Sequence, residues 1–251
     1  MYGRGYGSTG FGPTFTPPIV QRLLIANIAV FLLQVLTRGA YDGVAALTPL
    51  ALWGGGMLWQ PFTYMWMHGG LGHLLMNMFV LWMFGSQLAM AWGPRRFLRY
   101  YLVCGVGAGV IIGSVPFLLV GLHIAPSYIL QIPTVGASGA IYGVLLAYSL
   151  TWPDRTIMLI FPPVAFRAIW LIPALFFMSI VFDPGNVSHV GHLAGAAVGW
   201  VYLQSTGEAG ARITVAGLKH RYRRWRMRRK LRAVQYEEWE SKRRERDRRY
   251  H

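Results

Sequence analysis

The chain has 251 residues, of which 54% are hydrophobic and only 13% are charged, with a formal net charge of +15. Ordinary soluble domains carry about 25% charged residues, and here residues 206–251 alone hold 16 of the 24 Lys and Arg and 6 of the 9 Asp and Glu. The first 205 residues therefore cannot form the charged surface of a soluble domain, and we expect lipid to be their solvent. A basic tail beside a membrane domain is typical of the cytoplasmic side and of contact with anionic lipids, so we expect no nucleic-acid partner.

Residues 1–18 lack apolar periodicity, which predicts a flexible arm. The next segment, 19–37, is apolar, and no small-residue cleavage site follows it, so we expect a retained membrane helix and not a removed signal peptide. Six runs reach or approach the roughly 20 apolar residues that a spanning helix needs: 19–37, 70–91, 97–121, 137–152, 167–183 and 189–205. The sequence thus predicts an all-α membrane protein with six transmembrane helices over 19–205, followed by a basic cytoplasmic tail, 206–251.

Two connecting segments carry further signals. The link 38–69 is long and contains three consecutive glycines together with several Trp and Pro residues, which suggests an interfacial element between helices one and two. Residues 156–163 are apolar but end in Pro162-Pro163, which favours a loop at the membrane surface.

Orientation follows from the distribution of basic residues. With six spans, the basic residues outside the tail fall on the tail's side of the membrane, with Arg38 as the exception. Apart from Arg4 in the N-terminal arm, these are Arg22, Arg95, Arg96, Arg99, Arg155 and Arg167. The positive-inside rule then places both termini in the cytoplasm.

The fourth apolar run is too short to cross the membrane. From Ser138 to Thr151 it has 14 residues, which make a helix of about 21 Å at 1.5 Å per residue. The hydrocarbon core is about 30 Å thick, so a helix anchored at the cytoplasmic face by Asp154 and Arg155 would end roughly 10 Å short of the other face. Non-helical backbone at that depth must be buried in protein or reached by water. We therefore predict a polar cavity at Ser138 that opens away from the cytoplasm.

Polar residues in membrane spans are costly and are functional candidates by default. Ser138 lies in Gly136-Ala137-Ser138-Gly139, at a predicted helix start, where unpaired backbone N–H groups can stabilise an oxyanion. Flanking glycines such as Gly136 and Gly139 let a substrate backbone approach closely. The alternative is that this run of small residues only lets helices pack tightly.

His192 lies near the non-cytoplasmic end of the last predicted helix, at a depth comparable with Ser138. Gly195 and Gly199 recur every four positions in the same helix, so this helix can approach another backbone closely. A neutral imidazole on that face can act as a general base for a serine on the partner helix. The alternative is a histidine that is hydrogen-bonded to a backbone carbonyl.

His73 and Asn77 are four residues apart and share one helix face. Both side chains can donate hydrogen bonds, which suits an oxyanion hole; the alternative is an interhelical hydrogen-bond clamp. His68 precedes a Gly-Gly turn, and we expect a structural role in fixing the link onto the helix.

The sequence does not contain the residue patterns that other hydrolytic mechanisms require. His68 and His73 are five apart, about 140° around a helix, so they do not form a ligand pair there. No HExxH motif is present, and the acidic residues before the tail, Asp42, Asp154 and Asp183, all fall in predicted loops. Cys104 is single and lies in an apolar run. Serine chemistry is the hydrolytic option that remains, with no metal.

Together these motifs resemble the rhomboid family of intramembrane serine proteases, over roughly residues 19–205. The resemblance rests on Gly136-Ala137-Ser138-Gly139 opening the fourth helix, on His192-x-x-Gly195-x-x-x-Gly199 in the sixth, and on His73-x-x-x-Asn77 in the second. It implies a six-helix bundle of the bacterial type in a bacterial inner membrane, with segment 38–69 as a lateral interfacial loop. It implies single-span membrane proteins as substrates, and it implies no cofactor.

The resemblance also implies roles for the residues. Ser138 would form an acyl-enzyme, with His192 as the base, and the Ser138 N–H, His73 and Asn77 would stabilise the oxyanion. Tyr142 would stack beside His192. Phe176 and Phe177 on the fifth helix would belong to the substrate gate. The sequence departs from the family at Trp59-Gln60, where the first loop often has Trp-Arg, which puts the rigidity of that loop in doubt.

Two rival functions differ in class. A catalytically inactive relative that binds membrane clients would usually lack the serine or the histidine, and both are present here. A small transporter could also contain broken helices and buried polar groups. However, no internal repeat is evident, and the polar residues cluster toward one face.

Overall fold

The computed structural model describes residues 12–158, 164–182 and 189–206, together with 223–224, 226–227 and 239–240. The chain divides into two compact units, Met1–Ala209 and Gly210–His251. The second unit contains most of the predicted basic tail, so the prediction that the tail contacts anionic lipids falls mainly outside the described residues.

Helices occupy all six apolar runs in the described part of the chain. Three of them are long and apolar enough to cross a membrane: α1 (Pro18–Leu36), the continuous helix Leu71–Trp92, and α7 (Pro94–Gly121). The middle one consists of α5 (Leu71–Val80), a π-helical turn η2 (Leu81–Gly85) and α6 (Ser86–Trp92).

Three further helices are shorter: α8 (Ser138–Thr151), α9 (Leu171–Phe182) and α10 (His189–Ser205). Their bounds match the predicted runs to within a few residues. Because they fall below the usual spanning length, the count of six spans stays a prediction.

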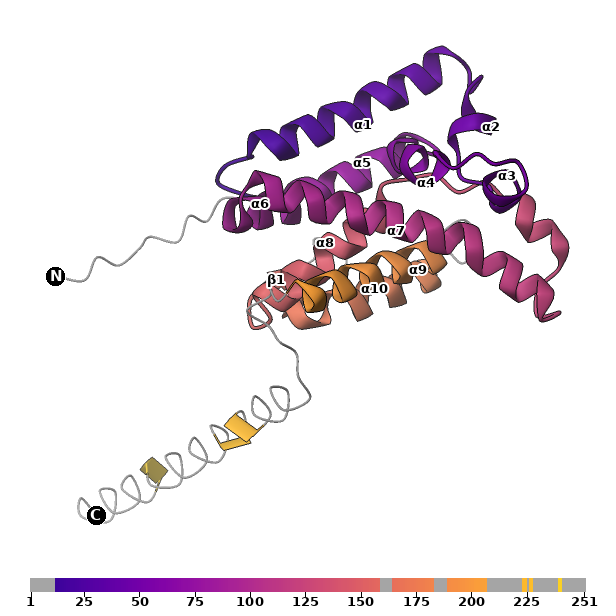
Figure 1. Cartoon of the computed structure of the whole chain (residues 1–251). Coiled ribbons are helices and arrows are strands. Elements are labelled where there is room, and N and C mark those ends of the chain that lie inside the picture. Colours follow the sequence, from indigo (N-terminus) through magenta and orange to yellow (C-terminus); the bar gives the residue numbers. More distant parts are fainter. Residues whose placement is uncertain are drawn as a thin grey trace, which may run out of the picture. The chain divides into compact units, whose positions relative to one another are not determined.

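The helices pack around α7, α8 and α10. Helix α1 contacts α5, α6 and α7, whereas α8 lies between α7, α9 and α10 (Figure 1). Small residues allow this packing: a side chain at Gly143 would collide with Cys104, and one at Gly199 would collide with the Tyr100 hydroxyl. Close backbone approach through small residues is the usual way in which membrane helices associate.

The link after α1 is structured. It contains α2 (Asp42–Ala45), α3 (Pro49–Trp53), α4 (Gln60–Thr63) and the 3₁₀ turn η1 (Tyr64–Trp66), and Figure 1 shows α2 to α4 gathered near the C-terminal end of α1. An isolated antiparallel bridge joins Leu47 to Thr134, with N–H to carbonyl distances of 3.0 and 2.8 Å. The link is thereby tied to the segment that leads into α8.

Gln60, which departs from the family pattern, is the buried centre of this link. Its Oε1 accepts the Thr48 N–H at 3.1 Å, and its Nε2 donates to the Val44 carbonyl at 3.4 Å. The neighbouring Trp59 Nε1 donates to the same carbonyl at 3.0 Å. A neutral amide can satisfy both a donor and an acceptor, so Gln60 connects the link without a buried charge.

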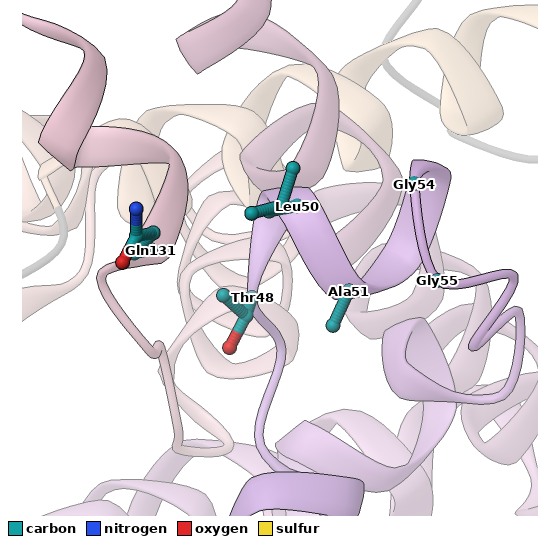
Figure 2. Close-up of a pocket in the computed structure, with 6 residues that line it drawn as sticks. All are labelled: Thr48, Leu50, Ala51, Gly54, Gly55 and Gln131. Atoms are coloured by element: carbon teal, nitrogen blue, oxygen red, sulfur yellow. The ribbon is translucent and has the colours of Figure 1, made fainter.

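A hollow lies between α3 and the 3₁₀ turn η3 (Ser127–Gln131), as Figure 2 shows. Its lining residues are Thr48, Leu50, Ala51, Gly54, Gly55 and Gln131. None of the predicted site residues borders it.

The surface loop predicted at 156–163 is partly a β-hairpin. Strand β1 (Thr156–Met158) pairs antiparallel with β2 (Ala165–Arg167), with Ile157 opposite Phe166, and residues 159–163 lie outside the described part. β-Branched and aromatic residues favour extended pairing. The strand and the 3₁₀ turn η4 (Ala168–Trp170) replace the first residues of the predicted fifth helix, so α9 begins later than 167.

Part of the predicted N-terminal arm is packed. Trp82 Nε1 donates to Thr16 Oγ1 at 2.9 Å, and Gly12 lies against the Trp82 ring so closely that a side chain at Gly12 would collide with it. Gly12 and Thr16 thus contact the helix Leu71–Trp92, because an indole ring offers both an apolar surface and a donor. The flexibility of the arm stays a prediction. Residues 1–11 lie outside the described part.

Candidate active site

Ser138 is the first residue of α8 and is half-buried. The preceding Gly136 is buried, has φ +126° and donates its N–H to the Tyr64 carbonyl at 2.9 Å. A left-handed φ of this kind strongly favours glycine. The backbone thus turns sharply at Gly136, and this turn places Ser138 at the start of the helix. The first N–H groups of a helix lack intrahelical acceptors.

Gly136 also brings His73 close to Ser138. The position that a Cβ would take at Gly136 lies 2.9 Å from His73 Nε2, 2.7 Å from His73 Cε1 and 3.8 Å from Ser138 Oγ. Any side chain larger than hydrogen would therefore meet the imidazole. The absence of a side chain at Gly136 is what allows the α5 histidine and the α8 serine to face the same small space.

The His73 ring has a defined orientation. The Gly69 N–H donates to His73 Nδ1 at 3.4 Å, and the His68 ring stands edge-on to it with centroids 5.3 Å apart. In a neutral imidazole, a nitrogen that accepts a hydrogen bond leaves the proton on the other nitrogen. The geometry therefore assigns the proton to Nε2, which lies 2.9 Å from the Cβ position of Gly136.

Asn77 lies one turn further along α5 and is 6% exposed. Its Nδ2 donates to the His73 carbonyl at 2.8 Å, which holds the amide on the same helix face as His73. The amide nitrogen carries a second proton that this bond does not use.

His192 on α10 is buried and stacks on Tyr142 of α8, with ring centroids 4.0 Å apart and the planes 9° from parallel. Its Nδ1 is buried and makes no hydrogen bond to any residue that the structure describes. The alternative, in which His192 is a structural residue that donates to a backbone carbonyl, therefore has no support at Nδ1.

The backbones of α8 and α10 are in contact beside this stack. A Cβ at Gly139 would lie 3.6 Å from the Gly191 carbonyl, and a Cβ at Gly195 would overlap the Gly139 carbonyl. Ser138 and His192 are the chain neighbours of Gly139 and Gly191, so the two helices present them at the same contact.

The two predicted gate residues on α9 face different surroundings. The Phe176 ring contacts His189, the first residue of α10, with centroids 5.9 Å apart at 79°, whereas Phe177 is 67% exposed. Phe176 thus lies between α9 and α10, and Phe177 points to the outside of the described bundle.

Tyr64 is a site residue that the sequence did not indicate. It is fully buried, its carbonyl accepts the Gly136 N–H, and its hydroxyl donates to the Gly105 carbonyl at 2.8 Å. The hydroxyl also lies 3.0 Å from the Cβ position of Gly139. Tyr64 supports both glycines that flank Ser138, but no motif marks it, because its partners are 41 or more residues away.

Among the described residues, no group of three or more His, Cys, Asp or Glu side chains is arranged to hold a metal ion.

Comparison with known proteins decides the family. Residues 55–208, more than half of the chain, match the model of the Rhomboid domain. The chain belongs to the rhomboid family. The match includes α5, α8 and α10, which carry the serine, the two histidines and the asparagine described above. With three helices long enough to span a bilayer, this rhomboid protein is an integral membrane protein.

Several relatives are similar over much of the chain. RHOMBOID-like protein 12, mitochondrial, of Arabidopsis thaliana is 30% identical over 72% of this chain and 56% of its own length. Rhomboid protein 1, mitochondrial, of Saccharomyces cerevisiae is 30% identical over 54% of this chain and 38% of its own. The human presenilin-associated rhomboid-like protein, mitochondrial, is 34% identical over 54% of this chain and 35% of its own.

The rhomboid chain thus spans between about a third and just over half of the length of these relatives. All three are named as mitochondrial proteins, which does not fit the prediction of a bacterial inner membrane. The integral-membrane assignment is unaffected.

Proposed function

We propose that this rhomboid protein is an intramembrane serine endopeptidase that cleaves transmembrane segments of other proteins. The observation that carries the proposal is the meeting of His73 Nε2 and Ser138 Oγ at the Gly136 backbone, within 2.9 and 3.8 Å of one point. A hydroxyl nucleophile and a polarised N–H donor facing one space are what acyl transfer requires.

The proposed reaction uses the described side chains. Ser138 Oγ bonds to the scissile carbonyl carbon while His192 accepts the hydroxyl proton. The carbonyl oxygen becomes an oxyanion that the Ser138 N–H, His73 Nε2–H and Asn77 Nδ2–H stabilise. Collapse breaks the peptide C–N bond, and His192 returns the proton to the leaving amine. Water then attacks the acyl-enzyme, with His192 as base, and regenerates Ser138.

The same proposal includes the finer membrane topology. All six helices would cross or enter the bilayer, with both termini in the cytoplasm and the link 38–69 at the opposite interface. The start of α8 would lie inside the membrane, because its 14 residues are too few to cross it. Single-span proteins would enter beside α9, past Phe176 and Phe177.

Fluorophosphonate labelling of the purified full chain in detergent tests this function. We expect labelling of the intact protein and its loss in Ser138→Ala and His192→Ala. Ser149→Ala is the matched control: Ser149 lies on the same helix, and its hydroxyl donates to the Leu145 carbonyl of that helix. We expect labelling of the control to be retained and activity to be insensitive to EDTA.

Failure of the intact, folded protein to be labelled would overturn the protease proposal. Retained binding of membrane proteins without cleavage would then favour an inactive rhomboid relative that binds clients.

A further inference from the structure

Gln34 on α1 joins two segments that are distant in the sequence. Its Oε1 accepts a hydrogen bond from the His68 N–H at 3.2 Å, and its Nε2 donates to Asp42 Oδ2 at 3.4 Å. A backbone N–H can only donate and a carboxylate can only accept, so the two partners determine which end of the amide faces which. Gln34 is therefore an oriented connection between α2 and the residues that precede α5.

The end of α1 holds Gln34 in this place. Arg38 adopts φ +51°, its N–H donates to the Val35 carbonyl at 3.1 Å, and the Gly39 N–H donates to the Gln34 carbonyl at 2.9 Å. This pair of bonds is a Schellman motif, which closes the helix end. A Cβ at Gly39 would lie 2.9 Å from Asp42 Oδ2, so the missing side chain leaves room for the carboxylate to fold back toward α1.

The connection continues from His68 to His73. The N–H that follows His68, that of Gly69, is the donor to His73 Nδ1. The buried His68 ring stands edge-on to the His73 ring. The position of the His68–Gly69 backbone therefore sets both the place of the His73 ring and the nitrogen that carries its proton.

We propose that Gln34, oriented by Asp42, is a positioning residue that keeps His73 Nε2–H directed at the space in front of Ser138. The catalytic consequence rests on the proposed function. The tautomer of His73 does not depend on activity and can be measured by itself.

The first test is ¹⁵N NMR of the full chain in detergent micelles with labelled histidine, the His73 signals being assigned from their loss in His73→Ala. We expect the Nε2–H tautomer in the intact protein and a mixture of tautomers in Gln34→Ala. In Gln34→Glu the new carboxylate is repelled by Asp42, and we again expect a mixture. In the double variant Gln34→Glu/Asp42→Asn, the new amide at position 42 can donate to the new carboxylate at position 34, which still accepts the His68 N–H. We expect His73 of this variant to return to the Nε2–H tautomer.

Gln21→Ala is the matched control. Gln21 lies on the same helix, and its amide donates to the Thr16 carbonyl near the other end. We expect this variant to keep both the tautomer and the activity of the intact protein.

The second test is cleavage of a labelled transmembrane substrate by the reconstituted full chain. Loss of one oxyanion donor costs about 10² to 10³ in kcat, so we expect that range for His73→Ala. A donor that is only misaligned retains part of its effect, and we expect about a tenfold fall in kcat for Gln34→Ala with KM unchanged. The double variant should regain most of the lost kcat.

The outcomes separate the two proposals. If the intact protein is neither labelled nor active, the protease function fails, and the tautomer measurement still decides the role of Gln34. If the protein is active but Gln34→Ala keeps the Nε2–H tautomer, or lowers thermal stability and kcat without recovery in the double variant, the positioning role is overturned.

Discussion

The His192 imidazole lies flat on the Tyr142 ring, with centroids 4.0 Å apart and planes 9° from parallel. This stack joins α10 to α8 one helical turn after Ser138. A histidine that exchanges a proton with a serine needs a fixed ring plane. Stacking on the face of the tyrosine ring holds the imidazole in such a plane. The face of the Tyr142 ring is thus a feature that orients the proposed base.

Replacement of Tyr142 tests the stack. Aromatic pairs contribute about 0.5–1.5 kcal/mol beyond their area burial, which corresponds to up to about a tenfold change in rate. We expect Tyr142→Ala to lower kcat by about that factor, and Tyr142→Phe to stay within about twofold because it keeps the ring. Steady-state cleavage in proteoliposomes measures both. A larger loss in the Phe variant than in the Ala variant would contradict the stacking role.

Replacement of Gly136 tests the meeting of His73 and Ser138. In Gly136→Ala the new methyl group meets His73 Nε2, and the residue must hold φ +126°, a strain of about 1–3 kcal/mol. We expect a fall of at least about a hundredfold in the fluorophosphonate labelling rate, because the oxyanion donor is displaced. Gly43→Ala is the control, since a Cβ there meets nothing within 4 Å. Unchanged labelling in Gly136→Ala would refute this geometry.

Replacement of Gly195 tests the contact between α8 and α10. A methyl group in Gly195→Ala would overlap the Gly139 carbonyl, a backbone atom that cannot move without its helix. Overpacking costs typically about 1–3 kcal/mol and occasionally more, so we expect a fall in melting temperature of several degrees. Thermal unfolding in detergent, with Gly121→Ala as the unhindered control, measures it. If Gly195→Ala and the intact protein had equal melting temperatures, α8 and α10 could move apart without loss of stability, and the close contact would not be needed.

Acidification tests the burial of His68, which lies before the membrane-spanning helix Leu71–Trp92. Burial, and secondly the neighbouring His73, lower the pKa of His68 from 6.5 to about 4. Because the folded state holds His68 neutral, its contribution to stability is complete above pH 6.5 and is lost as the pH falls from 6.5 to about 4. We expect the melting temperature to fall across this window, and to fall less steeply in His68→Gln. Identical pH profiles of the two proteins would exclude His68 as the cause.

The sequence by itself determined the membrane class and the six helical runs, and it marked the candidate catalytic residues. Apolar runs are visible because lipid requires continuous apolar segments. Ser138, His73, Asn77 and His192 stand out because polar residues in such runs are costly. Local signals also indicated the helix start at Ser138, since the Gly-Ala-Ser-Gly sequence suits a turn that leads directly into the first turn of a helix.

Only the tertiary structure decided which of these residues meet. That His73 Nε2 faces Ser138 depends on the positive φ of Gly136 and on the Gly69 N–H, and neither is encoded in spacing along one helix. The hydrogen-bond partners of Tyr64, Gln34 and Gln60 described above lie from 8 to more than 40 residues away, so no local pattern marks these residues. The β1–β2 hairpin was missed for the same reason: two three-residue strands become recognisable only when paired, because each alone leaves its backbone hydrogen bonds unmade.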